Sequence, residues 1–143
     1  MSKIEERLYQ AAREALGFSY APYSDYAVAA AVKTTDGKIF TGVNVENASY
    51  GLTVCAERVA LFNAIAAGCR AFTHLLVTSN DDNNLPLPCG ACRQVLMEFS
   101  PDIKITVVGS DYEKALSYSL KELLPHAFNY NAECRIKNAE LKR

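Results

Sequence analysis

The sequence predicts an α/β fold in which helices cover both faces of a mixed sheet. Segments with apolar residues at helical spacing alternate with shorter, continuously apolar segments typical of strands. Their order is helix, hairpin, helix, strand, helix, strand, which favours a layered α/β architecture. A chain of 143 residues suits one domain. We therefore expect residues 1–143 to form a single domain.

The first half of the chain supplies a helix and a hairpin. Apolar residues recur at helical spacing from Ile4 to Leu16, and Gly17 is a typical helix end. Residues 26–33 and 38–45 are predicted strands, and Thr35-Asp36-Gly37 between them indicates a hairpin turn.

The second half alternates helices and strands. We expect helices at 55–67, 89–99 and 120–124, and strands at 72–79 and 103–108, while 129–143 shows no clear pattern. Pro88 precedes the second of these helices and Pro101 follows it. Because a helix separates the last two predicted strands, they are expected to run parallel.

The charge balance argues against polyanionic partners. Fifteen basic and sixteen acidic residues give a net charge of −1, and no long run of like charge occurs. We therefore expect neither a nucleic acid nor a membrane partner. The N-terminal residues lack an apolar signal core, so we expect a cytoplasmic protein, where thiols stay reduced. The cysteines are then best interpreted as metal, catalytic or core residues.

Two cysteine motifs are the most informative feature. Cys55-Ala56-Glu57 and Pro88-Cys89-Gly90-Ala91-Cys92 each lie at the predicted start of a helix. Cys89 and Cys92 are three residues apart, so one helix face can present both to one ion. Cys55 and Glu57 can converge on a common site only in the first turn of a helix.

Such a constellation is suited to a catalytic zinc site. Zn²⁺ prefers tetrahedral geometry, and three thiolates leave the fourth position open to water. Glu57 would then be available to move protons to and from the zinc-bound water and a substrate. Arg58 can offset the negative charge of three thiolates by donating to their sulfurs.

Other interpretations of the cysteines remain open. A lone Cys-x-x-Cys motif is often a structural zinc knuckle or a redox pair. A structural site would need a fourth ligand, and the candidates are Cys69, Cys134, His74 and His126. None of these has a paired spacing, and the two cysteines also suit small buried positions.

With these motifs in view, the chain resembles the short, homotetrameric cytidine deaminases. The similarity extends from Tyr20 to about Phe128, and it is strongest at residues 44–50, 55–58 and 88–94. The general zinc-deaminase signature has a histidine at the first ligand position. The short tetrameric enzymes have cysteine there, as Cys55 is here. The resemblance implies a three-layer α/β/α sandwich with a five-stranded mixed sheet, and a homotetramer with shared active sites.

The resemblance also implies residue roles. Cys55, Cys89 and Cys92 would hold one Zn²⁺ per subunit, Glu57 would be the catalytic proton shuttle, and Arg58 would bond to the thiolates. Asn44 and Glu46 would bind the ribose 3′-hydroxyl, and the Ala56 backbone N–H and Tyr26 would contact the substrate. Tyr50 and Phe128 would reach the site of a neighbouring subunit. Without the motifs, Asn44 and Glu46 would be interpreted as solvated turn residues, and Tyr26 and Phe128 as core residues.

The implied reaction is hydrolytic deamination of cytidine and 2′-deoxycytidine to uridine and 2′-deoxyuridine, a step of pyrimidine salvage. Two positions depart from the family pattern, Ala29 in place of glycine and Leu87 in place of serine or threonine. We expect the extra methyl of Ala29 near the pocket wall. Residues 24–29 also resemble the blasticidin S deaminases, so deamination of another aminopyrimidine nucleoside is one alternative. A structural zinc protein without catalysis is the other.

Overall fold

The computed structural model describes residues 2–129 of the chain. In chain order its helices and strands are α1 (Lys3–Ala15), η1 (Leu16–Phe18), β1 (Val28–Thr34), β2 (Ile39–Val43), η2 (Tyr50–Leu52), α2 (Ala56–Ala66), β3 (Phe72–Ser79), α3 (Gly90–Phe99), β4 (Lys104–Val108), η3 (Tyr112–Lys114), β5 (Leu116–Ser119) and α4 (Leu120–Leu123).

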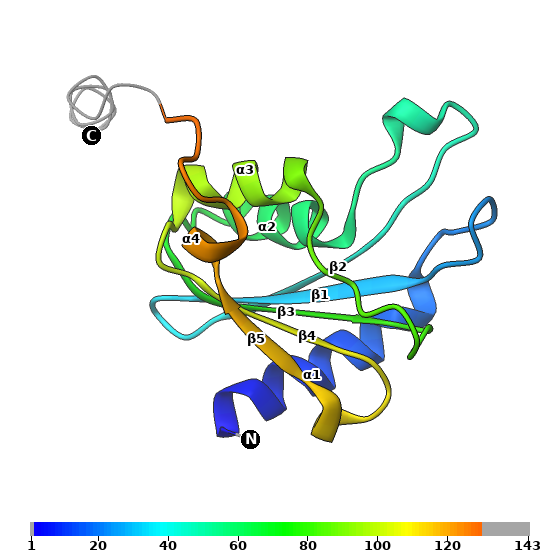
Figure 1. Cartoon of the computed structure of the whole chain (residues 1–143), viewed down its shortest axis with the longest axis horizontal. Helices are drawn as coiled ribbons and strands as arrows, with labels where there is room; N and C mark the ends of the chain where they lie inside the picture. The colour runs from blue at the N-terminus through cyan, green and yellow to red at the C-terminus, as the bar shows by residue number, and fades with distance from the viewer. Residues whose placement is uncertain (1, 130–143) are drawn as a thin grey trace.

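These elements form the predicted three-layer sandwich around a five-stranded mixed sheet. The strand order is β2-β1-β3-β4-β5, with β3 and β4 parallel and every other neighbouring pair antiparallel. Helix α1 covers one face of the sheet, while α2 and α3 cover the other (Figure 1). The predicted fold class is therefore confirmed.

Each face of the sheet has its own apolar core, because side chains of a strand alternate between faces. Val28, Ala30 and Val32 of β1 face α2 and α3. Ala29 and Ala31 face α1 instead. The two cysteine motifs lie at the starts of α2 and α3, so they are on the face of the sheet that packs against these two helices.

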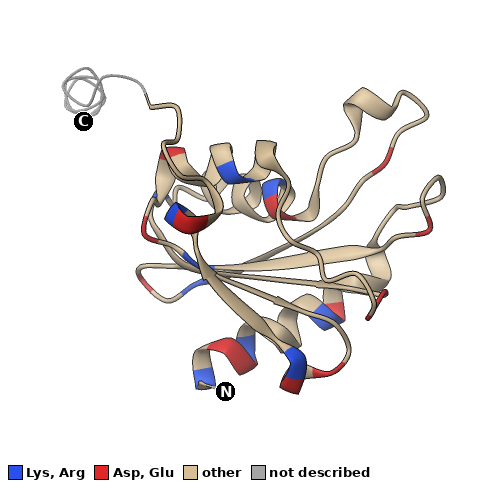
Figure 2. Ribbon diagram, in the orientation of Figure 1, with Lys and Arg blue, Asp and Glu red and all other residues tan. Residues whose placement is uncertain are grey.

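Helix α1 begins as its sequence suggests. The Ser2 hydroxyl accepts from the backbone N–H of Glu5, and the Glu5 carboxylate accepts from the backbone N–H of Ser2 at 3.2 Å. This reciprocal pair is a capping box, which satisfies donors that a helix start leaves free. Acidic and basic residues alternate along the exposed side of α1 (Figure 2). Among residues 2–129, no helix has the length and hydropathy to cross a membrane.

The structure corrects two details of the predicted strands. Strand β1 starts at Val28 rather than at residue 26, because the Tyr26 carbonyl and the Ala27 N–H bond to the side chains of Asn44 and Asn80. Strand β5 (Leu116–Ser119), antiparallel to β4, matches no predicted segment. It is a largely exposed edge strand of four residues, and the alternation of Leu116 and Tyr118 with two serines is too short to distinguish it from a loop.

Candidate active site

The starts of α2 and α3 bring three cysteines together. Cys55 is the N-cap of α2 and Cys89 is the N-cap of α3, while Cys92 lies buried in the first turn of α3. The Cys89 sulfur lies 3.7 Å from that of Cys55 and 3.6 Å from that of Cys92. All three sulfurs lie within 4.8 Å of one another. The predicted convergence of the two motifs is thus present in the fold.

The spacing of the sulfurs fits a tetrahedral zinc ion. Zn–S bonds of about 2.3 Å at tetrahedral angles place neighbouring sulfurs about 3.8 Å apart. The two sulfur–sulfur distances at Cys89 are close to that value. Within residues 2–129, Cys69, His74 and His126 do not join the cluster, and Cys134 lies outside the described residues. Three ligands with an open fourth position are typical of a catalytic zinc site.

The surroundings of Cys55 favour its thiolate form. Hydrogen bonding from Cys92, and then from Arg58, lowers the pKa of the Cys55 thiol to about 5. The Arg58 Nη2 lies 3.5 Å from the Cys55 sulfur. The pKa of Cys92 is raised, chiefly because its thiol hydrogen-bonds to the Cys55 sulfur. A cation held by all three sulfurs would displace such shared protons, because metal ligands must be deprotonated.

Glu57 lies buried beside this cluster and is not one of its members. Glu57 lies in the first turn of α2, two residues after the N-cap Cys55, and only 5% of the residue is exposed. Burial, and next the negative charge of Cys55, raise its pKa to about 7. A carboxyl group that titrates near neutrality can both accept and donate a proton, which general acid–base chemistry requires.

A cavity of about 380 Å³ opens over the cysteines and the carboxyl group. Its walls come from three places: the β1 start with Asn44, the α2 start, and the loop before α3. The lining residues are Tyr26, Val28, Asn44, Thr53, Cys55, Ala56, Glu57, Leu85, Pro86, Leu87 and Cys89. The cavity thus gathers six of the sequence-predicted substrate, catalytic and metal residues, and Cys92 is not among them: Tyr26, Asn44, Cys55, Ala56, Glu57 and Cys89.

Asn44 is buried at the cavity wall, where its amide group holds the chain that precedes β1. Its Oδ1 accepts from the Val28 N–H at 3.0 Å and from the Ser19 hydroxyl. Its Nδ2 donates to the Tyr26 carbonyl at 2.7 Å. An amide nitrogen carries two protons. One of them is used by Tyr26, and the second has no partner among residues 2–129.

Glu46 lies next to the main cavity rather than in it. It lines an adjoining cavity of about 310 Å³ with Tyr23, Ser24 and Tyr50, and Thr53 lines both cavities. Its carboxylate accepts from the backbone N–H groups of Tyr23 and Ser24 at 2.9 and 3.1 Å, and from the Ser24 hydroxyl. These bonds lower the pKa of Glu46, so the side chain is an anion at neutral pH.

The two residues expected to serve a neighbouring subunit are the most exposed members of the predicted site. Tyr50 is 74% exposed and packs edge-on against Tyr23, with ring centroids 5.8 Å apart. Phe128 is 75% exposed, in the segment that follows α4, and does not line the cavity of its own chain.

The sequence motifs did not predict that the loop before α3 forms part of the cavity wall. The Tyr26 hydroxyl donates to the Asn84 carbonyl at 2.9 Å, joining the chain before β1 to the loop before α3. Leu85 and Pro86 of that loop line the cavity. Pro86 and Pro88 indicate a loop of restricted conformation in the sequence. Nothing in the sequence indicates that this loop contacts Tyr26.

The expectation for Ala29 was wrong. Its side chain is fully buried on the α1 side of the sheet, while Val28 lines the cavity. The reason is the two-residue alternation of a strand, which points neighbouring side chains to opposite faces. Leu87 does line the cavity, with 46% of the residue exposed.

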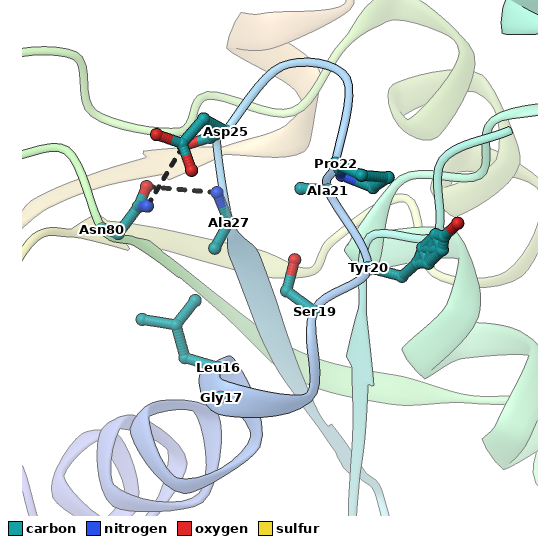
Figure 3. A pocket seen from close by; sticks show the side chains of 9 residues that line it. All are labelled: Leu16, Gly17, Ser19, Tyr20, Ala21, Pro22, Asp25, Ala27 and Asn80. Carbon is teal, nitrogen blue, oxygen red and sulfur yellow. Dashed lines mark hydrogen bonds between the residues drawn. The ribbon is translucent and has the colours of Figure 1, made fainter. Parts of the chain in front are cut away.

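A larger cavity, of about 550 Å³, lies between the end of α1 and the segment 19–27 (Figure 3). It contains none of the three cluster cysteines. Asn80 lies at its edge, where its Oδ1 accepts from the Ala27 N–H at 3.1 Å and its Nδ2 donates to the Asp25 carbonyl at 3.3 Å. These bonds hold the segment that carries Tyr26, so this region supports the site without adding reactive groups.

Comparison with known proteins agrees with this geometry. A family model described as the cytidine and deoxycytidylate deaminase zinc-binding region matches residues 2–110. A probable cytidine deaminase of Dictyostelium discoideum is 42% identical over 124 residues, which are 87% of this chain and 83% of the relative. The cytidine deaminase of Halalkalibacterium halodurans is 42% identical over 86% of this chain and 92% of its own.

Solved structures show the same similarity. The crystal structure of a cytidine deaminase from Burkholderia pseudomallei superimposes with a TM-score of 0.82 at 44% identity, covering 90% of this chain and all of that one. A cytidine deaminase from Mycobacterium tuberculosis gives a TM-score of 0.74 at 35% identity, covering 88% and 98%. The chain belongs to the zinc-dependent cytidine and deoxycytidylate deaminase family.

Proposed function

We propose that this protein catalyses the zinc-dependent hydrolytic deamination of cytidine and 2′-deoxycytidine, giving uridine or 2′-deoxyuridine and ammonia. The observation that carries the proposal is a cluster of three cysteine sulfurs beside one cavity, whose lining includes two of these cysteines and the buried carboxyl group of Glu57. The relatives named cytidine deaminase support the choice of substrate. The reaction would serve pyrimidine salvage.

Cys55, Cys89 and Cys92 would hold one zinc ion per subunit. Bound there, zinc lowers the pKa of a water molecule toward neutrality and so provides a nucleophile for C4 of the base. Arg58 would donate to the Cys55 sulfur, as its 3.5 Å contact indicates, and offset part of the thiolate charge.

Glu57 would carry the protons. Its carboxylate accepts a proton from the attacking water and delivers it to N3 of the base as the C4–O bond forms. The second proton of the water follows the same path to the exocyclic amine. The C4–N bond then breaks, C4 becomes a carbonyl carbon, and ammonia leaves. Burial raises the pKa of Glu57 above that of a solvated carboxyl group, which suits a group that must both accept and donate protons.

Substrate orientation would come from both cavity walls. The Ala56 N–H lies in the first turn of α2, where backbone donors have no partner within the helix, and it would bind the pyrimidine. Tyr26 would pack against the base. The free amide proton of Asn44 and the carboxylate of Glu46 would bind the 3′-hydroxyl, across the Thr53 boundary between the two cavities.

We further propose a homotetramer in the cytoplasm. Tyr50 and Phe128 are large, exposed aromatic side chains that do not line the cavity beside the three cysteines of their own chain, although Tyr50 lines the adjoining Glu46 cavity. A neighbouring subunit would cover them and receive them at its own site. A reducing compartment would keep the three ligand thiols from forming disulfides.

The structural-zinc alternative is disfavoured because residues 2–129 offer no fourth protein ligand at the cluster, which borders a cavity, whereas structural sites are closed by four protein ligands. The alternative of another aminopyrimidine nucleoside retains one supporting observation, the similarity of residues 24–29 to blasticidin S deaminases. Relative turnover of cytidine and blasticidin S separates the two activities.

The direct test is an absorbance assay with cytidine before and after zinc removal by a chelator. We expect turnover to disappear with the metal and to return when zinc is restored. Turnover that persists in metal-free protein, or an inactive protein with full zinc content, would reject the proposed function.

A further inference from the structure

An arginine at the start of α3 holds the backbone of the metal site. Arg93 is half-buried and directly follows Cys92. Its Nε donates to the Pro88 carbonyl at 2.7 Å, and its backbone N–H donates to the Cys89 carbonyl at 3.0 Å. These two carbonyls belong to the peptide groups on either side of the Cys89 Cα. Arg93 therefore constrains both backbone torsions of Cys89.

Apart from the contacts of its sulfur with those of Cys55 and Cys92, little else in the described chain restrains this cysteine. Cys89 is exposed, and as the N-cap of α3 it makes no side-chain capping bond. The preceding residue is a proline, which has no N–H to donate. The direction of the Cys89 Cα–Cβ bond, and so the place of its sulfur, depends on the two peptide groups that Arg93 holds.

The same guanidinium reaches a second part of the fold. Its Nη1 donates to the carbonyl of Leu123, the last residue of α4, at 2.7 Å. The last carbonyls of a helix lack partners within it, and a cation is favourable there. The next residue, Gln94, donates to the Phe128 carbonyl at 2.9 Å. Two neighbouring residues of α3 thus fasten the segment 120–128 to the ligand loop.

We propose that Arg93 is a positioning residue for the zinc ligand Cys89, and that it does so by bridging the Pro88 and Leu123 carbonyls. Through this bridge the segment 120–128 contributes to the affinity of the site for zinc. The proposal rests on the ligand set Cys55, Cys89 and Cys92 of the proposed function.

The chain offers a matched control. Arg70 also donates to two backbone carbonyls, those of Ile65 and Cys69, at 2.8 and 2.9 Å. These bonds lie at the end of α2 opposite to Cys55 and outside the cavity lining. Arg70→Gln therefore removes comparable bonds without touching the metal site.

The experiment compares zinc retention in wild-type protein, Arg93→Gln and Arg70→Gln during titration with a competing chelator, at a temperature below all three melting midpoints. Changes in groups that orient metal ligands typically weaken metal binding by about 10–100-fold. We expect Arg93→Gln to release zinc at about tenfold lower free chelator concentration than wild type, and Arg70→Gln to match wild type.

Arg93→Gln with wild-type zinc retention would overturn the proposal, and so would equal weakening in both variants, which would indicate a general loss of stability. Should Arg93→Gln fail to fold, Arg93→Lys is compared with Arg70→Lys by the same criteria, since lysine keeps the charge but has one nitrogen in place of the separate Nε and Nη1 donors that reach Pro88 and Leu123. Wild-type protein that binds no zinc would instead reject the proposed function.

Discussion

At the scale of single residues, the starts of α2 and α3 place Cys55, Glu57 and Cys89 around one point. The sequence motifs predicted that Cys55, Glu57 and Cys89 lie at helix starts. Both helices do start there, with Cys55 and Cys89 as their N-caps. The roles of Asn44 and Glu46 in holding the segment 19–28 could not be predicted. Their partners lie 16 to 25 residues away in the sequence, and only the folded chain brings them together.

Sugar recognition yields a prediction at this scale. Glu46 is an anion held by Tyr23 and Ser24, and a bound 3′-hydroxyl would add one further donor. Loss of one hydrogen bond to a charged group costs about 1.5–3 kcal/mol. We expect kcat/KM for 3′-deoxycytidine to be about 10–150-fold lower than for cytidine.

The measurement compares cytidine, 2′-deoxycytidine and 3′-deoxycytidine under identical conditions. The 2′-deoxy compound is the control, and its kcat/KM should remain close to that of cytidine. Equal efficiency on all three nucleosides would contradict the assignment of Glu46.

At the scale of elements, helix α2 is pressed directly against strand β2. A Cβ atom added at Gly42 would lie 2.2 Å from the Ala60 backbone nitrogen and 2.7 Å from the Ala56 carbonyl oxygen. Such a short distance to backbone cannot be relieved by a side-chain rotation. Gly42 therefore permits the close approach that places the start of α2, with Cys55 and Glu57, over the sheet.

We expect Gly42→Ala to destabilise the fold by at least about 1–3 kcal/mol, the usual cost of overpacking, and to lower zinc content as α2 shifts. Thermal melting and metal analysis measure the two effects. Gly17→Ala is the control, because a Cβ at Gly17 meets nothing within 4 Å. Similar melting of both variants would show that α2 is not fixed by this contact.

The docking of α1 predicts a pH dependence of stability. The hydrogen bond from Lys104 lowers the pKa of Glu5 to about 2, and the two groups are 2.6 Å apart. A depressed carboxyl pKa stabilises the fold above the unfolded pKa of about 4.5, and this contribution disappears as pH falls toward 2. Lys104 is partly exposed, so solvent screening limits the effect to about 1 kcal/mol or less.

Glu5→Gln should therefore lower Tm by about 2–4 °C at pH 7, and the difference from wild type should vanish near pH 2. Melting curves across this range provide the test. Glu6→Gln serves as the control, since Glu6 makes no ion pair within residues 2–129. A Tm difference independent of pH would show that the ion pair is not its cause.

At the scale of the whole molecule, the order of helices and strands predicted the sandwich, but not every strand. The apolar faces of α1, β1, β3 and β4 follow clear patterns that burial enforces. Strand β5 pairs with β4 through its backbone while its side chains remain largely exposed. Its alternation of Leu116 and Tyr118 with serines covers only four residues, which is too short a pattern to predict a strand.

Replacement of the exposed Phe128 tests whether neighbouring subunits complete each other's active sites. If Phe128 completes a neighbouring site, Phe128→Ala should lower turnover of cytidine while zinc content stays at the wild-type level. Light scattering at the assay concentration should show a tetramer for the wild type. Phe18→Ala is the control, because Phe18 is equally exposed, at 81%, but belongs to η1. A fully active wild-type monomer would contradict this part of the account.

The central claim is that a buried carboxyl group beside three zinc-binding cysteines performs the proton transfers of deamination, and Glu57→Gln tests it most directly. Glutamine keeps the size of the side chain but cannot carry protons. One general acid–base group contributes about 10²–10⁴ in rate, and Glu57 is assigned several transfers. The measurement is cytidine turnover of Glu57→Gln beside its zinc content. We expect full zinc occupancy with turnover reduced by about 10⁴-fold or more. A loss of tenfold or less in zinc-replete protein would contradict the claim, and loss of the zinc itself would make Glu57 a ligand.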